Sequence, residues 1–256
     1  MNNLLMAIAM GMIYWLSRAM VGGYFALFFI GNPIFVGVIA GLIYGDVLTG
    51  LIIGGGMAAV FAGIIAPGGN LPTDQGMAAT TMIPIALSTG LAAQQAIALA
   101  VPIGLLGAQL LNLRKMVNIP LAHKADVAAE NLDIKGIESA AIWTPLLTSF
   151  ILLFVPVFVI NLFGQDVMLK LLEVTPEWIM HGLSVAGGIM PGVGFALIIN
   201  SIGKPKLIPY FLIGFILAAA LGLNNLVIGV MAISVAIITV NNHNRITAQI
   251  SNMKEA

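Results

Sequence analysis

Few side chains in this 256-residue sequence could take part in chemistry, and two aspartates interrupt its long uncharged runs. Asp46 ends the uncharged run 19–45 and lies between Tyr44-Gly45 and Val47. The other aspartate belongs to a polar cluster formed by Asn70, Thr73, Asp74 and Gln75. These side chains offer hydrogen-bond donors and acceptors in fixed directions, as a site for sugar hydroxyls requires. The alternatives are a helix end at the membrane surface for Asp46 and an exposed loop for Asp74.

Two further polar side chains, His181 and Asn200, lie within or beside the apolar run 179–203. His181, which begins the run close to Trp178, either lies at the membrane interface or lines a binding site. Asn200, like Gln94 and Gln95, either lines a binding site or forms a helix–helix hydrogen bond. His123 and His243 lie in polar segments, where solvation is the expected state.

Composition and motifs exclude several kinds of site. No spacing resembles a metal site or a nucleophile triad, no Walker A sequence is present, and the chain has no cysteine. We therefore predict no catalytic residue, no metal and no cofactor. The formal net charge of +0 gives no indication of a nucleic-acid partner.

The elements that position these residues are membrane helices. Hydrophobic residues make up 60% of the chain and charged residues 8%, whereas a soluble domain carries about 25% charge. We predict an all-α polytopic membrane protein with several transmembrane helices and broken or re-entrant segments. Its apolar sequence would suffice for about eight or nine crossings, and fewer full crossings are expected because some runs are interrupted.

Charges divide the chain into segments within one membrane domain, residues 1–256. Residues 4–17 form a first, retained membrane segment, since the N-terminus lacks the basic region of a secretory signal. The run 77–113 is too long for one crossing and predicts a break near 88–90 or 102–104. Further spans are expected at 140–164 and 179–203, with two short segments in 207–240 that meet near 222–225.

Two polar segments are expected outside the bilayer. Residues 114–138 hold four basic side chains, and residues 241–256 form a polar tail. The positive-inside rule predicts that both are cytoplasmic. The composition of residues 122–131 favours an amphipathic surface helix.

Glycine and proline, at 29 and 12 residues, interrupt many apolar runs. Small residues let helices pack closely, but breaks also surround binding sites in transporters, where irregular backbone lines a cavity. For residues 67–76 and 187–194 we favour broken helices around a site.

Three stretches between about residues 30 and 240 carry motifs that are specific when taken together. The first stretch is Asn32-Pro33-Ile34 with Gly41-Leu42-Ile43-Tyr44-Gly45-Asp46-Val47-Leu48-Thr49-Gly50 and Gly54-Gly55. The second is Ala125-Asp126 with Gly136-Ile137-Glu138. The third is Gly182-Leu183-Ser184-Val185-Ala186-Gly187-Gly188-Ile189-Met190-Pro191 with Gly194-Phe195-Ala196, continuing into Ile208-Pro209-Tyr210-Phe211. In this order and spacing they resemble the IIC membrane subunit of the mannose/fructose/sorbose family of the bacterial phosphoenolpyruvate-dependent sugar phosphotransferase system.

The resemblance implies a multi-pass permease subunit of the bacterial cytoplasmic membrane that is not an enzyme by itself. Family members pair with a second membrane subunit, IID, and bind a sugar from outside. A cytoplasmic IIB subunit, phosphorylated on histidine by IIA, then phosphorylates the arriving hexose or amino sugar. The resemblance further implies an elevator-like movement and a trimer of IIC–IID pairs.

One departure from the family pattern concerns the sugar. Relatives often carry Gly-Gly-Thr-Leu-Glu after the Asp-x-x-Thr-Gly motif, whereas this chain has Gly54-Gly55-Gly56-Met57-Ala58. The absence of a carboxylate at Ala58 predicts a different sugar or another sugar-contacting residue, such as Asp74. Two alternatives to the IIC hypothesis are an ion-coupled secondary transporter that acts alone and a structural membrane protein without a substrate.

Overall fold

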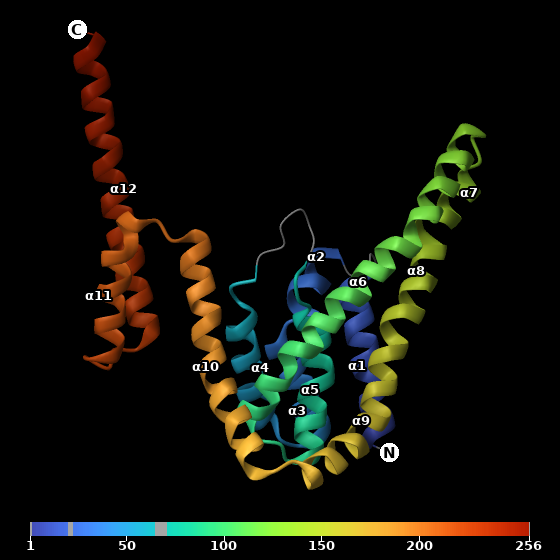
Figure 1. Cartoon of the computed structure of the whole chain (residues 1–256). Coiled ribbons are helices and arrows are strands. Elements are labelled where there is room, and N and C mark those ends of the chain that lie inside the picture. The colour runs from blue at the N-terminus through green and yellow to red at the C-terminus, as the bar shows by residue number, and fades with distance from the viewer. Residues whose placement is uncertain (1, 20–22, 65–70, 256) are drawn as a thin grey trace. The chain divides into compact units, whose positions relative to one another are not determined.

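The computed structural model describes residues 2–19, 23–64 and 71–255, and all regular structure in these ranges is helical (Figure 1). The chain divides into two compact units, Met1–Ser201 and Ile202–Ala256. The helices of the first unit are α1 (Asn2–Arg18), α2 (Gly23–Phe25), α3 (Pro33–Tyr44), α4 (Val47–Phe61), α5 (Gln75–Thr89), α6 (Ala93–Glu130), α7 (Ile134–Glu138), α8 (Thr144–Ser149), α9 (Val155–Val174) and α10 (Glu177–Ile202). Its π-helical turns are η2 (Ala26–Ile30), η4 (Ser139–Trp143) and η5 (Phe150–Phe154).

Four helical segments in the described ranges are long and apolar enough to cross a bilayer: Ala93–Glu130, Ile134–Val174, Glu177–Ser201 and Asn225–Asn242. The second of these runs without interruption from α7 through α9. The chain is a multi-pass membrane protein, and the prediction of an all-α membrane fold is confirmed.

Helices α3 and α4 form a hairpin of two short elements. At 12 and 15 residues, they are about 18 and 22 Å long, which is less than the hydrocarbon thickness of about 30 Å. Gly45 closes α3 in the left-handed conformation, with φ 82°, and Asp46 caps the start of α4. The backbones touch because Gly37 and Gly50 face each other, and a Cβ on either would meet the carbonyl oxygen of the other.

Helix α5 lies at the centre of the first unit and packs against α1, α3, α4, α6 and α9 (Figure 1). Every residue from Gly76 to Ala86 is buried. Pro84 lies within the helix and cannot donate a backbone hydrogen bond to the carbonyl of Thr80, four residues earlier. Asn161 of α9 replaces the missing donor, since its Nδ2 lies 3.0 Å from the Thr80 oxygen. A side chain on a neighbouring helix therefore satisfies a backbone group that the proline leaves free.

The π-helical turns η4 and η5 come directly before two prolines. Pro145 and Pro156 occupy the first turns of α8 and α9. A π turn joins a carbonyl to the N–H five residues later, so the helix continues although each proline lacks an N–H. The segment from α7 to α9 can thus cross as one piece despite both prolines.

Several expected boundaries agree with the structure. Helix α5 ends at Thr89 and Gly90 has φ 70°, so the long run 77–113 breaks at the first of its two predicted positions, while Pro102 stays inside α6. In the second unit, η6 (Pro205–Leu207) leads into α11 (Ile208–Ala219), and Gly222, with φ 62°, precedes α12 (Asn225–Glu255). The predicted meeting of two segments near 222–225 is confirmed.

Two predictions were wrong. The helix expected at residues 122–131 is not a separate surface element but the last part of α6, which continues for 38 residues. The glycine-rich stretch 187–194 is not a break, because α10 is continuous through Pro191. Close packing explains two of its glycines: a Cβ on Gly187 would meet the Gln94 carbonyl, and one on Gly194 would meet the Ala59 carbonyl.

Candidate functional site

The candidate site forms where the chain enters α5. Asp74 is fully buried and caps this helix, with its Oδ1 accepting hydrogen bonds from the backbone N–H groups of Gly76 at 2.8 Å and Met77 at 3.4 Å. An aspartate is a favoured N-cap because its carboxylate pairs with the free N–H groups of the first turn. The local sequence therefore fixes Asp74 at the helix start.

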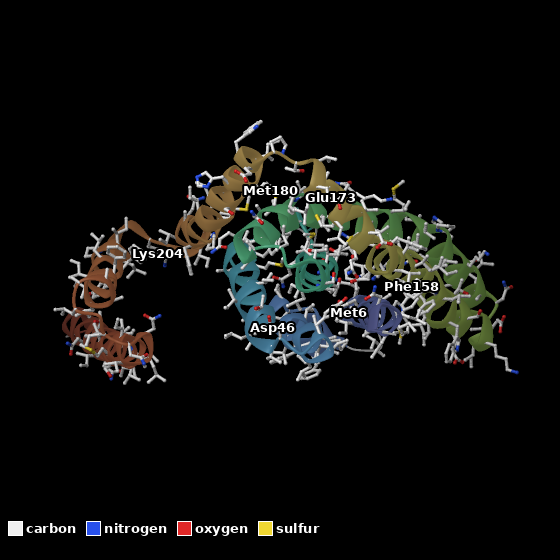
Figure 2. The ribbon with its side chains drawn as sticks, turned by 90° about the horizontal axis from the view of Figure 1, so that it is seen from below. Met6, Asp46, Phe158, Glu173, Met180 and Lys204 are labelled. Carbon is white, nitrogen blue, oxygen red and sulfur yellow. The ribbon has the colours of Figure 1, made fainter. Side chains whose placement is uncertain are left out.

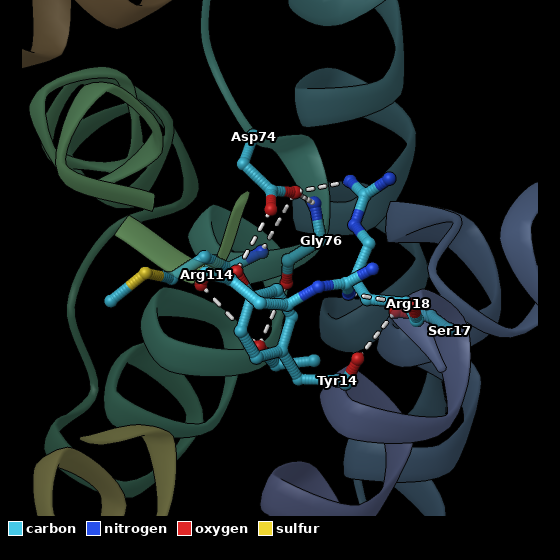
Figure 3. Close-up of polar contacts among 8 residues, drawn as sticks. Tyr14, Ser17, Arg18, Asp74, Gly76 and Arg114 are labelled. Carbon is cyan, nitrogen blue, oxygen red and sulfur yellow. Dashed lines mark hydrogen bonds and ion pairs between the residues drawn. The ribbon is translucent and has the colours of Figure 1, made fainter. Parts of the chain in front are cut away.

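Helix α1 supplies two partners to the same carboxylate. The Tyr14 hydroxyl donates to Asp74 Oδ2 at 2.9 Å, and the Arg18 guanidinium forms an ion pair with Oδ1 (Figure 3). Tyr14 and Arg18 are four residues apart on α1 and so lie on one face of the helix. Tyr14 is fully buried and the Arg18 side chain is 11% exposed. The Asp74 carboxylate is thus well paired, whereas the Arg18 Nε is buried and has no hydrogen-bond partner among the described residues.

Helix α6 completes the cluster. The backbone N–H of Asp74 donates to the Gly104 carbonyl at 2.8 Å, and Arg114 donates from Nη1 to the backbone oxygen of Arg18 at 2.8 Å. Figure 3 shows Arg18 and Arg114 close together beside Asp74 and Tyr14. Three helices are thus held to one turn, and both oxygens of Asp74 are occupied by protein groups. This carboxylate therefore fixes the position of the turn.

The neighbours of Asp74 retain hydrogen-bonding capacity. The Thr73 hydroxyl is buried and has no hydrogen-bond partner among the described residues. It lies against Gly104, where a Cβ would approach the hydroxyl oxygen to 2.5 Å. Gln75 is half-buried at the first position of α5. Thr73 and Gln75 can therefore offer a hydroxyl and an amide to a ligand.

The structure unites only part of the predicted residue set. Thr73, Asp74 and Gln75 lie together, and Asn70 lies outside the described residues. His181 and Asn200 are exposed on α10, and no hydrogen bond within the described ranges joins either of them to Asp74.

Asp46 is exposed and accepts a hydrogen bond from the Thr49 N–H at 3.0 Å. Hydrogen bonding from Thr49 lowers the pKa of this carboxyl, as expected for a helix cap. Asp46 is therefore a helix end, the alternative considered for it. In Figure 2 it lies at the α3–α4 hairpin, away from Met180 at the start of α10.

Gln95 forms the helix–helix hydrogen bond that was considered for it. Its Nε2 donates to the Met180 carbonyl of α10 at 3.1 Å, while its Oε1 accepts from the backbone N–H of Ala92 at 3.3 Å. Gln95 thus ties the start of α6 to α10.

Sequence reasoning missed Tyr14, Arg18 and Arg114 as members of the cluster. A signal was present for the arginines: Arg18 is a lone charge between apolar runs, and Arg114 is the first charge after the run 77–113. A charge at such a position requires a partner inside the protein. For Tyr14 the sequence carries no comparable signal, since a tyrosine in an apolar segment also occurs at membrane interfaces.

Comparisons with known proteins point to one family. The sequence model of the family described as "PTS system sorbose-specific iic component" matches residues 4–238. The N-acetylgalactosamine permease IIC component 1 of Escherichia coli (strain K12) is 32% identical over 217 residues, which cover 85% of this chain and 78% of that protein. The sorbose-specific EIIC component of Lacticaseibacillus casei is 31% identical over 241 residues, covering 90% and 86%.

A solved structure also resembles this chain. It belongs to the complex of the mannose transporter ManYZ with microcin E492, with a TM-score of 0.56, 25% sequence identity and 94% coverage of both chains. The likeness therefore extends over nearly the whole helical arrangement of both proteins.

Proposed function

Because the chain belongs to the family of sorbose-specific IIC components of the sugar phosphotransferase system, we propose that it carries a hexose or an amino sugar across the bacterial cytoplasmic membrane. It is a permease subunit, and phosphoryl transfer is the task of the IIB partner, so the chain is not an enzyme by itself. The observation that carries this conclusion is the family match over residues 4–238. It leaves no basis for an ion-coupled carrier that acts alone or for a purely structural protein.

We propose further that the working assembly contains a IID membrane subunit, that IIC–IID pairs form a trimer, and that the sugar moves by an elevator-like displacement. The likeness to a chain of the ManYZ complex supports a membrane partner.

For the sugar site we propose the turn before α5. The Thr73 hydroxyl has no partner among the described residues and the half-buried Gln75 adds an amide beside it, while Asp74 is held by Tyr14 and Arg18 and fixes the position of the turn. Asn70 belongs to the same proposal on sequence grounds. Asp46, His181 and Asn200 are weaker proposals, because each is exposed and none is bonded to the cluster within the described part of the chain.

Uptake of a panel of radiolabelled hexoses and amino sugars tests this function. Cells would express the chain with its neighbouring subunits, either with or without the IIB partner. We expect one sugar to arrive as its phosphate, and only when IIB is present. Accumulation of an unmodified solute by cells that express this chain alone would contradict the proposal.

The panel also tests the departure at Ala58. If a carboxylate in relatives helps to choose the sugar, then Ala58→Glu should change the relative rates of uptake among the panel sugars. Gly55→Ala is the matched control on α4, since a Cβ at Gly55 meets nothing within 4 Å. A glutamate that leaves all relative rates unchanged would exclude Ala58 as a position that determines specificity.

A further inference from the structure

A cavity lined mainly by apolar atoms, with Arg114, Asn118 and Ser149 as its polar members, lies beside the candidate site, between the end of α1, the middle of α6 and the η4–α8 segment. Its volume is about 370 Å³, within the range of roughly 300–1,000 Å³ that ligand pockets occupy. The residues that line it are Ala19, Arg114, Asn118, Ala141, Ile142, Pro145, Leu146 and Ser149. This cavity is not part of the turn before α5.

The charge at this cavity is positive. Arg18 and Arg114 come together, and Asp74 is the carboxylate that pairs with Arg18. Arg114 donates from Nη1 to the Arg18 backbone oxygen, which is a neutral acceptor, and no ion pair joins Arg114 to a carboxylate within residues 2–19, 23–64 and 71–255. A guanidinium carries five N–H donors in a planar fork that fits phosphate oxygens. The half-buried Arg114 can therefore bind an anion from the cavity.

The position of the cavity along α6 corresponds to the level of the lipid headgroups. The uncharged part of α6, residues 93–113, contains no ionisable side chain and would extend about 32 Å as a helix. This is close to the thickness of the hydrocarbon core, about 30 Å. Arg114 and Asn118 follow directly, one turn apart on the same face of α6. If the uncharged run crosses the bilayer, its length places Arg114 and Asn118 at the end of the hydrocarbon, on the side that the positive-inside rule predicts to be cytoplasmic.

The remaining lining groups suit the headgroup of a lipid. Asn118 Oδ1 is buried and has no hydrogen-bond partner among the described residues, so it can accept a bond from a glycerol hydroxyl. The Ser149 hydroxyl, which donates to the Leu146 carbonyl at 2.8 Å, lies on the opposite wall. That wall is otherwise apolar, and Ile142 and the neighbouring Leu147 are 42% and 62% exposed. Exposed aliphatic surface beside the cavity provides a path for acyl chains.

We propose that this cavity binds the phosphate headgroup of an anionic glycerophospholipid, with Arg114 on the phosphate and Asn118 on the headgroup hydroxyl. Basic pockets between transmembrane helices on the cytoplasmic side are typical sites for such headgroups. A lipid bound here would also touch the helix face that holds Arg18, so its occupancy would support the α1–α6 contact behind the sugar site.

The test uses the full chain, purified in detergent with its partner membrane subunit, and follows thermal unfolding while phosphatidylglycerol or phosphatidylcholine is added. Native mass spectrometry counts the lipids that remain bound. Phosphatidylglycerol should stabilise the protein at a concentration at which phosphatidylcholine does not. In Arg114→Gln the concentration of phosphatidylglycerol needed for half the effect should rise about five-fold or more, as expected for loss of one basic contact to an anionic lipid.

Three further variants complete the comparison. Ala141→Leu adds bulk to the lining of the cavity and should also weaken lipid binding. Lys124→Gln removes a charge from an exposed position on the same helix and should behave like the unmodified protein. Asn118→Leu should weaken phosphatidylglycerol binding and leave the response to phosphatidylcholine unchanged.

Two results would overturn the proposal. One is that Arg114→Gln and Ala141→Leu both bind phosphatidylglycerol as tightly as the unmodified protein does. The other is that inorganic phosphate or a hexose 6-phosphate stabilises the protein and displaces the lipid at equal concentration, which would assign the cavity to a soluble phosphate. Both readouts are independent of sugar uptake, so a failure of the transport hypothesis would leave this result unaffected.

Discussion

The hydrogen bond from Asn161 to the Thr80 carbonyl gives the sharpest prediction about stability. Asn161→Leu removes the donor that replaces the N–H missing at Pro84, with little change in side-chain size. The Nδ2–oxygen distance is 3.0 Å and both groups are buried. An unsatisfied buried carbonyl costs about 1–3 kcal/mol, and interhelical hydrogen bonds measured in a membrane protein average about 0.6 and reach about 1.7 kcal/mol. We therefore expect Asn161→Leu to lower the free energy of unfolding by about 1 kcal/mol.

A double-mutant cycle isolates this bond from other effects of the substitution. Pro84→Ala restores a backbone N–H that can bond the Thr80 carbonyl within α5, so Asn161→Leu should cost much less in that background. Reversible unfolding of the purified protein in mixed micelles of a mild detergent and dodecyl sulfate measures each of the four free energies. Asn200→Leu, on an exposed part of α10, is the control, with an expected change within about 0.5 kcal/mol.

The result that would refute this reasoning is an equal loss in both backgrounds. It would mean that Asn161 stabilises the protein by packing or by its second hydrogen bond, from Nδ2 to the Val157 carbonyl at 2.8 Å. The Thr80 carbonyl would then need no partner beyond its own helix.

Three further predictions concern the site and its supports. Arg18→Met leaves Asp74 buried without its ion pair and should destabilise the protein by about 3–5 kcal/mol. Adding Asp74→Asn should recover part of this loss. If the double variant is no more stable than Arg18→Met in the same unfolding assay, the Arg18–Asp74 pairing is contradicted. Gly54→Ala forces a Cβ against the Pro33 carbonyl and should lower the free energy of unfolding by about 1–3 kcal/mol. Gly55→Ala, whose Cβ meets nothing within 4 Å, should change it by no more than about 0.5 kcal/mol. Equal thermal stabilities of the two variants would contradict close packing of the α3–α4 hairpin at Gly54. Thr73→Val removes a hydroxyl without a partner among the described residues, so stability should hold while the KM for sugar uptake rises about 3- to 10-fold, and an unchanged KM would remove Thr73 from the site.

The cap residues could be predicted from the sequence, although their role could not. Asp46 and Asp74 stood out as carboxylates at the ends of apolar runs, and each proves to cap a helix through the backbone N–H groups that follow it. Capping depends only on the cap residue and the next three residues of the chain, so the local sequence is enough to predict it. The sequence alone could not decide whether such a carboxylate is free for a ligand, and it proposed Asp74 as a sugar contact.

The sequence also could not show which glycines pack against another helix. Gly187 and Gly188 are neighbours in one motif, yet a Cβ would clash with the Gln94 carbonyl at the first and meet nothing within 4 Å at the second. Which glycine faces another helix depends on the rotation of α10, and the sequence pattern of small residues does not fix that rotation. The predicted break at this motif was wrong because the backbone of α10 stays helical through these glycines and Pro191.

The sequence by itself determined the membrane class, the helical content, the ends of α5 and α11 and, through its motifs, the family. These properties follow from hydropathy and from backbone preferences that act over a few residues. Only the tertiary structure decided that Arg18 reaches Asp74 across 56 positions and that Asn161 reaches Thr80 across 81. Such pairs join residues far apart in the chain. Helix packing brings a buried charge or a free carbonyl next to a group that can pair with it, because an unpaired polar group in an apolar interior costs free energy.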